Sequence, residues 1–182
     1  KSRMLNISDC CLVFVDVQGK LAQLMVGKEA LFRSIRILIQ AAQILEIPIL
    51  WCQQVPEALG PTAPEIAELL TGGTPIDKAS FSCCGQEQFN AELNALDREQ
   101  VLLCGIESHV CVYQTAMDLM EGGLEVTIVA DAVSSRTEQN RQTALARLAA
   151  EGAHISSTEM VLFELLRTAK HPRFKDIARL VK

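Results

Sequence analysis

Short apolar segments alternate with amphipathic segments along the chain. Five of the apolar segments are rich in β-branched residues and too short for helices, a pattern typical of buried strands. They cover residues 11–17, 47–54, 101–106, 124–132 and 152–156. Apolar residues recur at spacings of three and four over residues 31–45, 89–96 and 112–120. This period predicts an amphipathic helix in each of these three segments.

The order of these segments predicts the fold. Strand and helix alternate repeatedly, and a short apolar segment just before Lys78 adds a further strand. Parallel strands joined by right-handed helical crossovers have helices on both faces of their sheet. We therefore expect residues 1–182 to form a single three-layer α/β/α sandwich domain, with a mainly parallel, Rossmann-like sheet of about six strands. Ligand sites in such sheets lie beyond the carboxyl ends of the strands, where the strand order reverses.

Capping and turn residues refine this pattern. Ser135 precedes Glu138 by three positions, and Ser156 precedes Glu159 by three, which is the capping-box spacing found at helix starts. We expect two further helices to begin at these serines. Residues 56–85 contain four prolines and several glycines, so this segment is predicted to be mostly loop and to have a functional role.

Composition narrows the class of protein. With 182 residues, of which 49% are hydrophobic, the chain is long enough to bury a sizeable core. Its formal charge of −5 provides no basic surface for nucleic acid. The longest apolar runs fall far short of the ~20 residues that a spanning helix needs, and no signal-peptide core is present. We expect a cytoplasmic protein that binds neither nucleic acid nor membranes.

The cysteines do not indicate a structural cross-link. The chain has seven of them, and no two have the C-x-x-C spacing. This odd number without paired spacing predicts neither a disulfide framework nor a zinc finger, and we expect no metal and no cofactor. Cys11, Cys52 and Cys104 fall inside apolar, strand-like segments, where a free thiol behaves as a small buried hydrophobic group.

Three chemically active side chains fall at the predicted carboxyl edge of the sheet. Asp16 follows the first strand, Lys78 follows a short strand, and Cys111 begins a helix after another strand. A helix N-terminus and a nearby cation both favour a thiolate. Asp16 is suited to take the thiol proton and later to return it to a leaving group. Backbone N–H groups between Gly105 and Cys111 are placed to bind an oxyanion.

Each of these three residues also has an ordinary structural explanation. An Asp at a strand end often forms a turn or caps a helix. A lysine in a loop is usually solvated, and a cysteine at a helix start is more often buried and inert than reactive. The shared position of Asp16, Lys78 and Cys111 at one edge favours catalysis over these separate explanations.

Four segments resemble the isochorismatase-like cysteine hydrolases, a family that includes nicotinamidases and N-carbamoylsarcosine amidases. The segments read LVFVDVQ, DKASFS, GIESHVCVYQTAMDL and VADAVSSR, and they span nearly the whole chain. The third is the most specific, since it is similar to the family pattern G-[IVL]-x-[ST]-x-x-C-V at Gly105, Ile106, Ser108, Cys111 and Val112. Through GPTAPEI, ADAVSSR and HPRFKDIARLVK, the chain most resembles the isochorismatase domain-containing group, many of whose members have no assigned substrate.

The resemblance implies a role for each residue at the predicted edge. Cys111 is implied to be the nucleophile, Asp16 the general base and acid, and Lys78 the residue that holds the charged pair in place. The family also has a cis peptide bond that would here join Ile106 and Glu107. By the same resemblance, the backbone N–H groups of Glu107 and Cys111 bind the oxyanion. The resemblance also implies a homo-oligomer, either a dimer or a larger assembly.

The histidines limit the substrate. The family's nicotinamidases bind a metal through an Asp-x-His and a further His after the second strand, whereas the histidines here are His109, His154 and His171. A nicotinamidase with that metal site is therefore not expected. Several isochorismatases, which cleave a vinyl ether, lack the cysteine that this chain has, so isochorismate is also disfavoured. We expect a hydrolase of a small amide or related carbonyl compound, with its physiological substrate unassigned.

Residues beside the strand ends suggest the lining of the pocket. Gln18, Gln53 and Phe81 occupy such positions and are predicted to contact a small substrate in a rather apolar pocket. His109 lies two residues before Cys111, and side chains two positions apart diverge at a helix start. We expect His109 to be solvated or at an interface instead of catalytic.

Two other classes of function compete with a hydrolase. In a binding or interaction module that has lost its catalysis, the carboxylate of Glu107 would crowd the pocket or oppose a thiolate. A nucleotide-binding protein would need a G-x-G-x-x-G turn or a G-x-x-x-x-G-K-[ST] loop. The first strand is instead followed by DVQGKLAQ, which contains a single glycine, so nucleotide binding is set aside.

Overall fold

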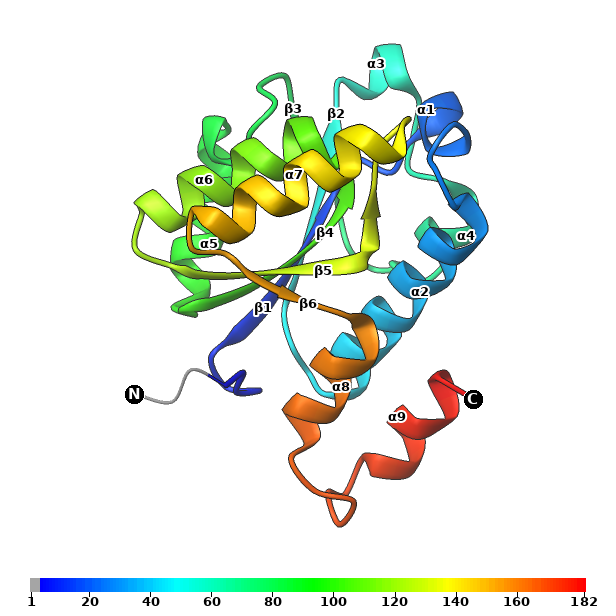
Figure 1. The fold of residues 1–182 in the computed structure, drawn as a ribbon, viewed down its shortest axis with the longest axis vertical. Helices are drawn as coiled ribbons and strands as arrows, with labels where there is room; N and C mark the ends of the chain where they lie inside the picture. The colour runs from blue at the N-terminus through cyan, green and yellow to red at the C-terminus, as the bar shows by residue number, and fades with distance from the viewer. Residues whose placement is uncertain (1–3) are drawn as a thin grey trace.

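The computed structural model describes residues 4–182, which form a parallel sheet covered by helices on both faces (Figure 1). The sheet has six strands in the order β3-β2-β1-β4-β5-β6. They are β1 (Cys10–Val15), β2 (Ile49–Gln54), β3 (Ile76–Lys78), β4 (Gln100–Ile106), β5 (Glu125–Ser134) and β6 (His154–Ser156). The predicted α/β/α fold with a parallel sheet of about six strands is confirmed.

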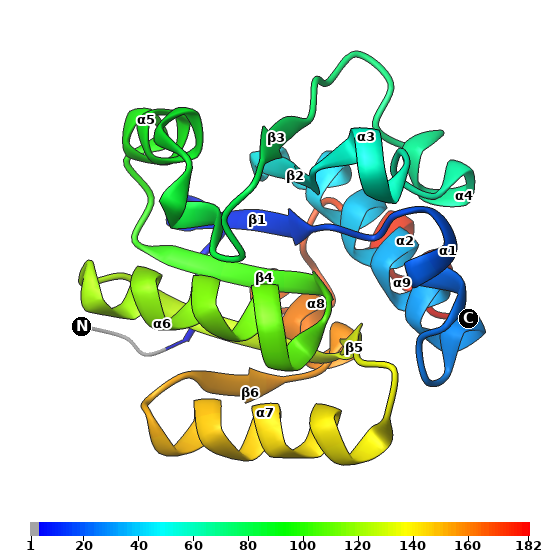
Figure 2. The same cartoon turned by 90° about the horizontal axis from the view of Figure 1, so that it is seen from above.

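Two layers of helices cover the sheet, as Figure 2 shows from above. The longer helices are α2 (Lys28–Ile44), α5 (Glu87–Leu96), α6 (Tyr113–Glu121), α7 (Glu138–Ala150), α8 (Thr158–Leu166) and α9 (Phe174–Leu180). The shorter helical segments are α1 (Gly19–Gln23), α3 (Pro56–Leu59), α4 (Pro64–Ala67), the turn η1 (Cys83–Gly85) and the π-helical turn η2 (Ser108–Val112). The three amphipathic helices predicted from the period correspond to α2, α5 and α6.

Two apolar cores hold the three layers together. Helices α2, α8 and α9 contribute to one core, while α5, α6 and α7 contribute to the other. Along β1, Leu12 and Phe14 belong to the first core, and Val13 and Val15 belong to the second. Because side chains alternate between the faces of a strand, a strand buried on both faces reads as a continuous apolar run.

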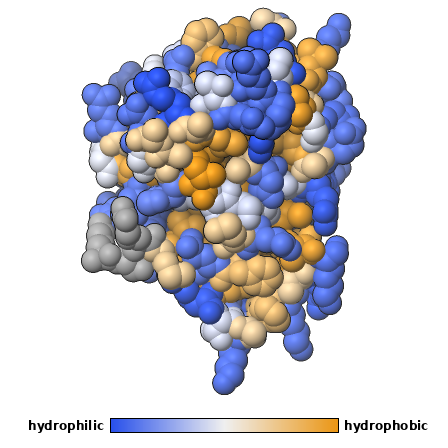
Figure 3. Space-filling view, in the orientation of Figure 1, coloured by the Kyte–Doolittle hydropathy of each residue, from blue (hydrophilic) through white to orange (hydrophobic). Residues whose placement is uncertain are grey.

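The outer surface is mixed in character. On the face shown in Figure 3, apolar side chains lie in small groups among polar ones. Some large apolar side chains, including Met160 and Phe163 of α8, are well exposed. Within residues 4–182, no helix combines the length and apolar character needed to cross a membrane.

The starts of α7 and α8 differ from the predicted capping boxes. The N-cap residues are Thr137 and Ser157, whose hydroxyl groups each accept a backbone N–H three residues later, at 3.2 Å. The prediction of helix starts at Ser135 and Ser156 is therefore wrong by one or two positions. Strand β5 continues to Ser134, so the chain needs Ser135 for the connection before the helix can begin. Local spacing alone did not distinguish the neighbouring hydroxyl residues.

The strand order places the reversal point between β1 and β4. From these adjacent strands the chain proceeds to opposite halves of the sheet, so their carboxyl ends open onto one crevice. Gly105 allows the two strands to approach closely here, because a Cβ atom at this residue would lie 2.1 Å from the carbonyl oxygen of Val15. Its φ of +121° is also disfavoured for residues with side chains. Asp16 and η2 therefore leave the sheet side by side.

Candidate active site

Asp16 lies directly after β1 with its side chain turned into the protein. Its φ of 55° is in the left-handed region, and its backbone N–H donates to the carbonyl of Cys52 at 3.1 Å. The residue is 2% exposed. A buried carboxylate needs a partner to offset the loss of its hydration.

Lys78 supplies that partner from the carboxyl end of β3. Its Nζ lies 2.7 Å from Asp16 Oδ2, and both side chains are almost fully buried. The same ammonium donates to Gln54 Oε1 at 2.6 Å and to the carbonyl oxygens of Ser80 and Phe81 at 3.1 and 2.9 Å. The residues predicted to form the acid and the ammonium of the site thus make a buried ion pair.

Cys111 lies within η2, at the beginning of the helical segment that continues as α6, and it is 7% exposed. Its thiol lies close enough to Asp16 for the carboxylate charge to raise the pKa of the thiol. Asp16 Oδ1 is buried and has no hydrogen-bond partner among residues 4–182. The peptide bond between Ile106 and Glu107, just before η2, is cis. The structure therefore brings Asp16, Lys78 and Cys111 together at one point.

The electrostatics of this group favour a neutral thiol at rest. Burial, followed by the nearby charge of Asp16, raises the pKa of Cys111 to about 12, although Lys78 partly opposes the rise. Burial also raises the pKa of Asp16, again opposed by the Lys78 charge. For Lys78, burial lowers the pKa, but Asp16 and the nearby thiols raise it more. We assign an Asp16 carboxylate, a Lys78 ammonium and a protonated Cys111; the predicted resting thiolate is not supported.

Glu107 lies at the start of η2, and its carboxylate is bound by Arg136. The Arg136 backbone N–H and Nε donate to Glu107 Oε2, each at 3.0 Å, and Nε also lies 3.1 Å from Oε1. Glu107 is buried, whereas the Arg136 side chain is 57% exposed. The carboxylate that would crowd the pocket or oppose a thiolate in a non-catalytic binding module is thus paired with a cation of the segment after β5.

His109 connects η2 to the end of β5. Its Nδ1 lies 2.9 Å from the hydroxyl of Ser135, which is fully buried. The imidazole is half-buried, and this hydrogen bond joins it to the serine instead of to Cys111. This placement gives His109 a bond across the loops that carry the site and agrees with its exclusion from the catalytic group.

Gln18 and Gln53 lie near the site, but protein groups already engage their amides. Gln18 donates to the carbonyls of Gln54 and Gly60 at 3.0 and 2.8 Å, and it accepts from the Gln54 backbone N–H at 2.6 Å. Gln53 accepts from Thr62 and donates to Asp77. Both glutamines therefore organise the segment after β2, and substrate contact by either remains a prediction.

Phe81 is placed differently from the two glutamines. Its carbonyl group accepts from Lys78, while the residue as a whole is 53% exposed. An exposed side chain on a residue whose carbonyl contacts Lys78 is available to contact a ligand, and this role also remains a prediction.

Gln54 is the polar residue of the site that sequence reasoning missed. It lies at the end of β2, beside Lys78 in the parallel register, and its Oε1 makes the shortest contact to the ammonium. The available signal was the period of two along the strand, which puts Gln54 on the same face as Cys52. Gln53, for which the sequence predicts substrate contact, has its side chain on the opposite face of the strand.

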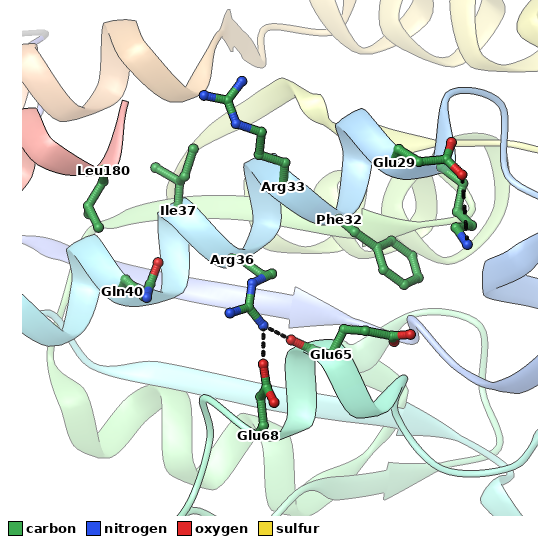
Figure 4. A pocket seen from close by; sticks show the side chains of 10 residues that line it. Glu29, Phe32, Arg33, Arg36, Ile37, Gln40, Glu65, Glu68 and Leu180 are labelled. Carbon is green, nitrogen blue, oxygen red and sulfur yellow. Dashed lines mark hydrogen bonds and ion pairs between the residues drawn. The ribbon is translucent and has the colours of Figure 1, made fainter. Parts of the chain in front are cut away.

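A cavity of about 550 Å³ lies away from this group, between α2, α4 and the end of α9 (Figure 4). Arg36 crosses it and bonds to the Glu65 carbonyl and the Glu68 carboxylate. None of its lining residues belongs to the Asp16, Lys78 and Cys111 group. Residues 4–182 also contain no cluster of three or more His, Cys, Asp or Glu side chains positioned to hold a metal ion.

Comparison with known proteins identifies the family. The isochorismatase domain model matches residues 10–160, which include all three residues of the group. The chain belongs to the isochorismatase family of hydrolases. Isochorismatase domain-containing protein 2 of Danio rerio is 40% identical over 177 residues, covering 97% of this chain and 89% of that protein. The resemblance inferred from the motifs is confirmed.

Two further relatives differ in what their names describe. The secreted isochorismatase effector Isc1 of Phytophthora sojae (strain P6497) is 38% identical over 175 residues, covering 94% of this chain and 83% of that protein. The solved structure of the MAR1 ribonuclease from Caenorhabditis elegans is 37% identical, with a TM-score of 0.92, and covers 98% of this chain and 92% of that one. Family membership therefore leaves the substrate and the cellular location of this chain open.

Proposed function

We propose that this protein is a cysteine hydrolase that cleaves the C–N bond of a small amide or a related carbonyl compound. One observation carries the proposal: Lys78 holds Asp16 Oδ2 at 2.7 Å, Oδ1 is buried without a hydrogen-bond partner in the described part of the chain, and the Cys111 thiol lies near this carboxylate. A carboxylate in this position is a general base directed at a nucleophile.

The first half-reaction forms a thioester and releases an amine. Cys111 Sγ attacks the carbonyl carbon while Asp16 Oδ1 accepts the thiol proton, which gives a tetrahedral intermediate with a negatively charged oxygen. The backbone N–H groups of Glu107 and Cys111 are our proposed donors to this oxygen. Asp16 then passes the proton to the nitrogen as the C–N bond breaks, so that ammonia or an amine departs.

The second half-reaction uses water as the nucleophile. Asp16 accepts a proton from the water as its oxygen attacks the thioester carbonyl. The C–S bond then breaks, and the proton returns to the sulfur of Cys111. The products are a carboxylic acid and the free enzyme. Lys78 keeps Asp16 ionised before each proton transfer, because its positive charge lowers the pKa of this buried carboxyl group.

The placement of Glu107 supports a hydrolase over a binding module that has lost its catalysis. Its carboxylate is held by two groups of Arg136, at 3.0 Å each, and is neutralised by the guanidinium. A carboxylate restrained in this way neither fills the space beside the nucleophile as a free charge nor removes the general base. Lys78 still contacts Asp16, and Cys111 lies near enough to both for their charges to shift the pKa of its thiol.

Ribonuclease activity is a second candidate, because a relative that is 37% identical carries that name. RNA cleavage proceeds at phosphorus and needs cations that bind the phosphate backbone. Here the formal charge is −5, and the one ammonium of the group is fully buried against protein oxygens. These features favour a small neutral substrate. They also agree with the prediction that the protein does not bind nucleic acid.

The decisive experiment compares the two substrates on the same preparations. Parent protein, Cys111→Ser and Cys84→Ser are each incubated with a panel of small primary amides, and released ammonia is measured; a labelled single-stranded RNA is tested in parallel. Cys84 is the matched control, since its thiol is only partly buried and lies outside the group. We expect ammonia release by the parent and by Cys84→Ser, and none by Cys111→Ser. RNA cleavage without amide hydrolysis, or unchanged hydrolysis in Cys111→Ser, would overturn the proposal.

A further inference from the structure

We propose that Gln54 is a positioning residue, which fixes the Lys78 ammonium and thereby directs the free oxygen of Asp16 at Cys111. The inference rests on the proposed function and adds a fourth side chain to its machinery. Gln54 is 8% exposed and lies at the end of β2, next to the strand that carries Lys78.

The donors of Lys78 are fully used by protein oxygens. An ammonium has three N–H groups, and four acceptors surround this one. Gln54 Oε1 at 2.6 Å and Asp16 Oδ2 at 2.7 Å are the two nearest. The carbonyls of the adjacent residues Ser80 and Phe81, at 3.1 and 2.9 Å, share the third donor. Lys78 therefore has no N–H left for a substrate, and its contribution is its charge and its hold on Asp16.

Every polar atom of Gln54 makes a hydrogen bond to another residue. Its Nε2 donates to the Ala79 carbonyl at 2.8 Å, so its Oε1 is the amide atom that faces Lys78. Its backbone N–H and carbonyl bond to the two ends of the Gln18 amide, at 2.6 and 3.0 Å. Gln18 also donates to Gly60 at 2.8 Å, which ties this arrangement to the segment of residues 56–85. The acceptor presented to Lys78 is thus rigid.

The position of the Lys78 ammonium affects Cys111 through Asp16. With Oδ2 bound to a fixed ammonium, the carboxylate cannot rotate freely. By this inference its unpartnered Oδ1 stays directed toward the nearby Cys111 thiol. Without Gln54, Lys78 would lose its shortest contact. The ammonium would then shift toward its remaining acceptors, Asp16 Oδ2 and the carbonyls of residues 80 and 81. A shift would turn the carboxylate and move the positive charge that favours the Cys111 thiolate.

The test is a double-mutant cycle read at Cys111. Gln54→Met removes the amide at similar size, and Lys78→Met removes the group through which it is proposed to act. Gln100→Met is the matched control, because Gln100 is equally buried and hydrogen-bonded but lies at the amino end of β4. For each variant, the rate of alkylation of Cys111 by iodoacetamide is measured from pH 6 to pH 10, with the modified peptide located by mass.

We expect Gln54→Met to slow alkylation about tenfold at each pH, as a rise of one unit in the thiol pKa requires. In the Lys78→Met background the same change should alter the rate less than about twofold, since coupled residues lose their separate effects. Gln100→Met should leave the rate unchanged. The inference is overturned if Gln54→Met matches the parent, or if it slows the reaction equally with and without Lys78.

A fallback variant and an independent readout make this test decisive. If Lys78→Met does not fold, the cycle is repeated on Asp16→Asn/Lys78→Met, which removes both buried charges together. The readout is also independent of the amide panel. A parent that hydrolyses amides but shows no coupling between Gln54 and Lys78 refutes the positioning role alone, whereas clear coupling in a protein without hydrolysis refutes the proposed function alone.

Discussion

Replacing Lys78 with Met leaves the Asp16 carboxylate buried without its cation, and this change tests the electrostatic core of the site. The Asp16 side chain is 3% exposed and its Oδ2 lies 2.7 Å from Nζ. Removing one partner of a buried pair usually costs about 3–5 kcal/mol, because the remaining charge has neither water nor a counter-ion. For a protein of this size, that loss corresponds to a fall in Tm of roughly 6–20 °C.

The loss should depend on pH in a defined direction. Burial raises the pKa of Asp16, and Lys78 is the main group that opposes this rise, so the pKa should rise further in Lys78→Met. A carboxyl group whose folded pKa exceeds its unfolded value of about 3.9 is deprotonated first in the unfolded chain as pH increases. The free energy of unfolding of the variant therefore falls between the two pKa values. The deficit relative to the parent should be smallest near pH 4 and largest at pH 8.

Urea unfolding followed by circular dichroism at pH 4.5, 6 and 8 measures this deficit. Lys175→Met is the matched control, since it removes an exposed lysine from α9. The double variant Asp16→Asn/Lys78→Met should recover much of the stability at pH 8, because it leaves no buried charge. A deficit below about 1 kcal/mol at pH 8, or one that is the same at all three pH values, would show that the pair is not the buried ion pair described here.

Three smaller changes test other parts of the structure. Gly105→Ala should reduce stability by at least about 3 kcal/mol in urea unfolding, since its Cβ would lie 2.1 Å from the Val15 carbonyl oxygen. Thr137→Ala should lower the free energy of unfolding by about 1 kcal/mol, because α7 loses the hydroxyl that caps it. Thr137→Ser keeps this hydroxyl, so an equal loss in that variant would contradict the explanation. Glu107→Gln should lower Tm while leaving Cys111 alkylation within about twofold, because its charge is already neutralised by Arg136.

Much of the fold was predictable because the sheet is buried on both faces. A continuous apolar run such as that of β1 indicates a strand buried on both faces. The spacing of apolar residues along α2 clearly indicates a helix. The helix starts were less predictable. Ser135 and Thr137 both carry hydroxyl groups suited to capping, and only the length of β5 decides between them.

The site was predictable to the extent that topology alone determines it. Asp16, Lys78 and Cys111 follow parallel strands, so their proximity follows from the strand order. The assignment of Gln54 and the protonation of Cys111 were not accessible in this way. The period of two along β2 separates the faces of the two glutamines. Only the packed structure shows that the face of Gln54 meets Lys78 and how fully the thiol is desolvated.

A protonated nucleophile makes the pH dependence of hydrolysis a test of the mechanism. With a pKa of about 12, Cys111 is almost never a free thiolate at neutral pH, so its proton must move to Asp16 as the C–S bond forms. The rate of amide hydrolysis should then rise with the ionisation of Asp16, above its ordinary pKa, and stay level through pH 8 to 9. Attack by a preformed thiolate would instead make kcat/KM increase about tenfold per unit up to pH 10. Such a continuous rise would refute base catalysis by Asp16, whereas a plateau that is lost in Asp16→Asn would assign the acidic limb to this carboxyl group.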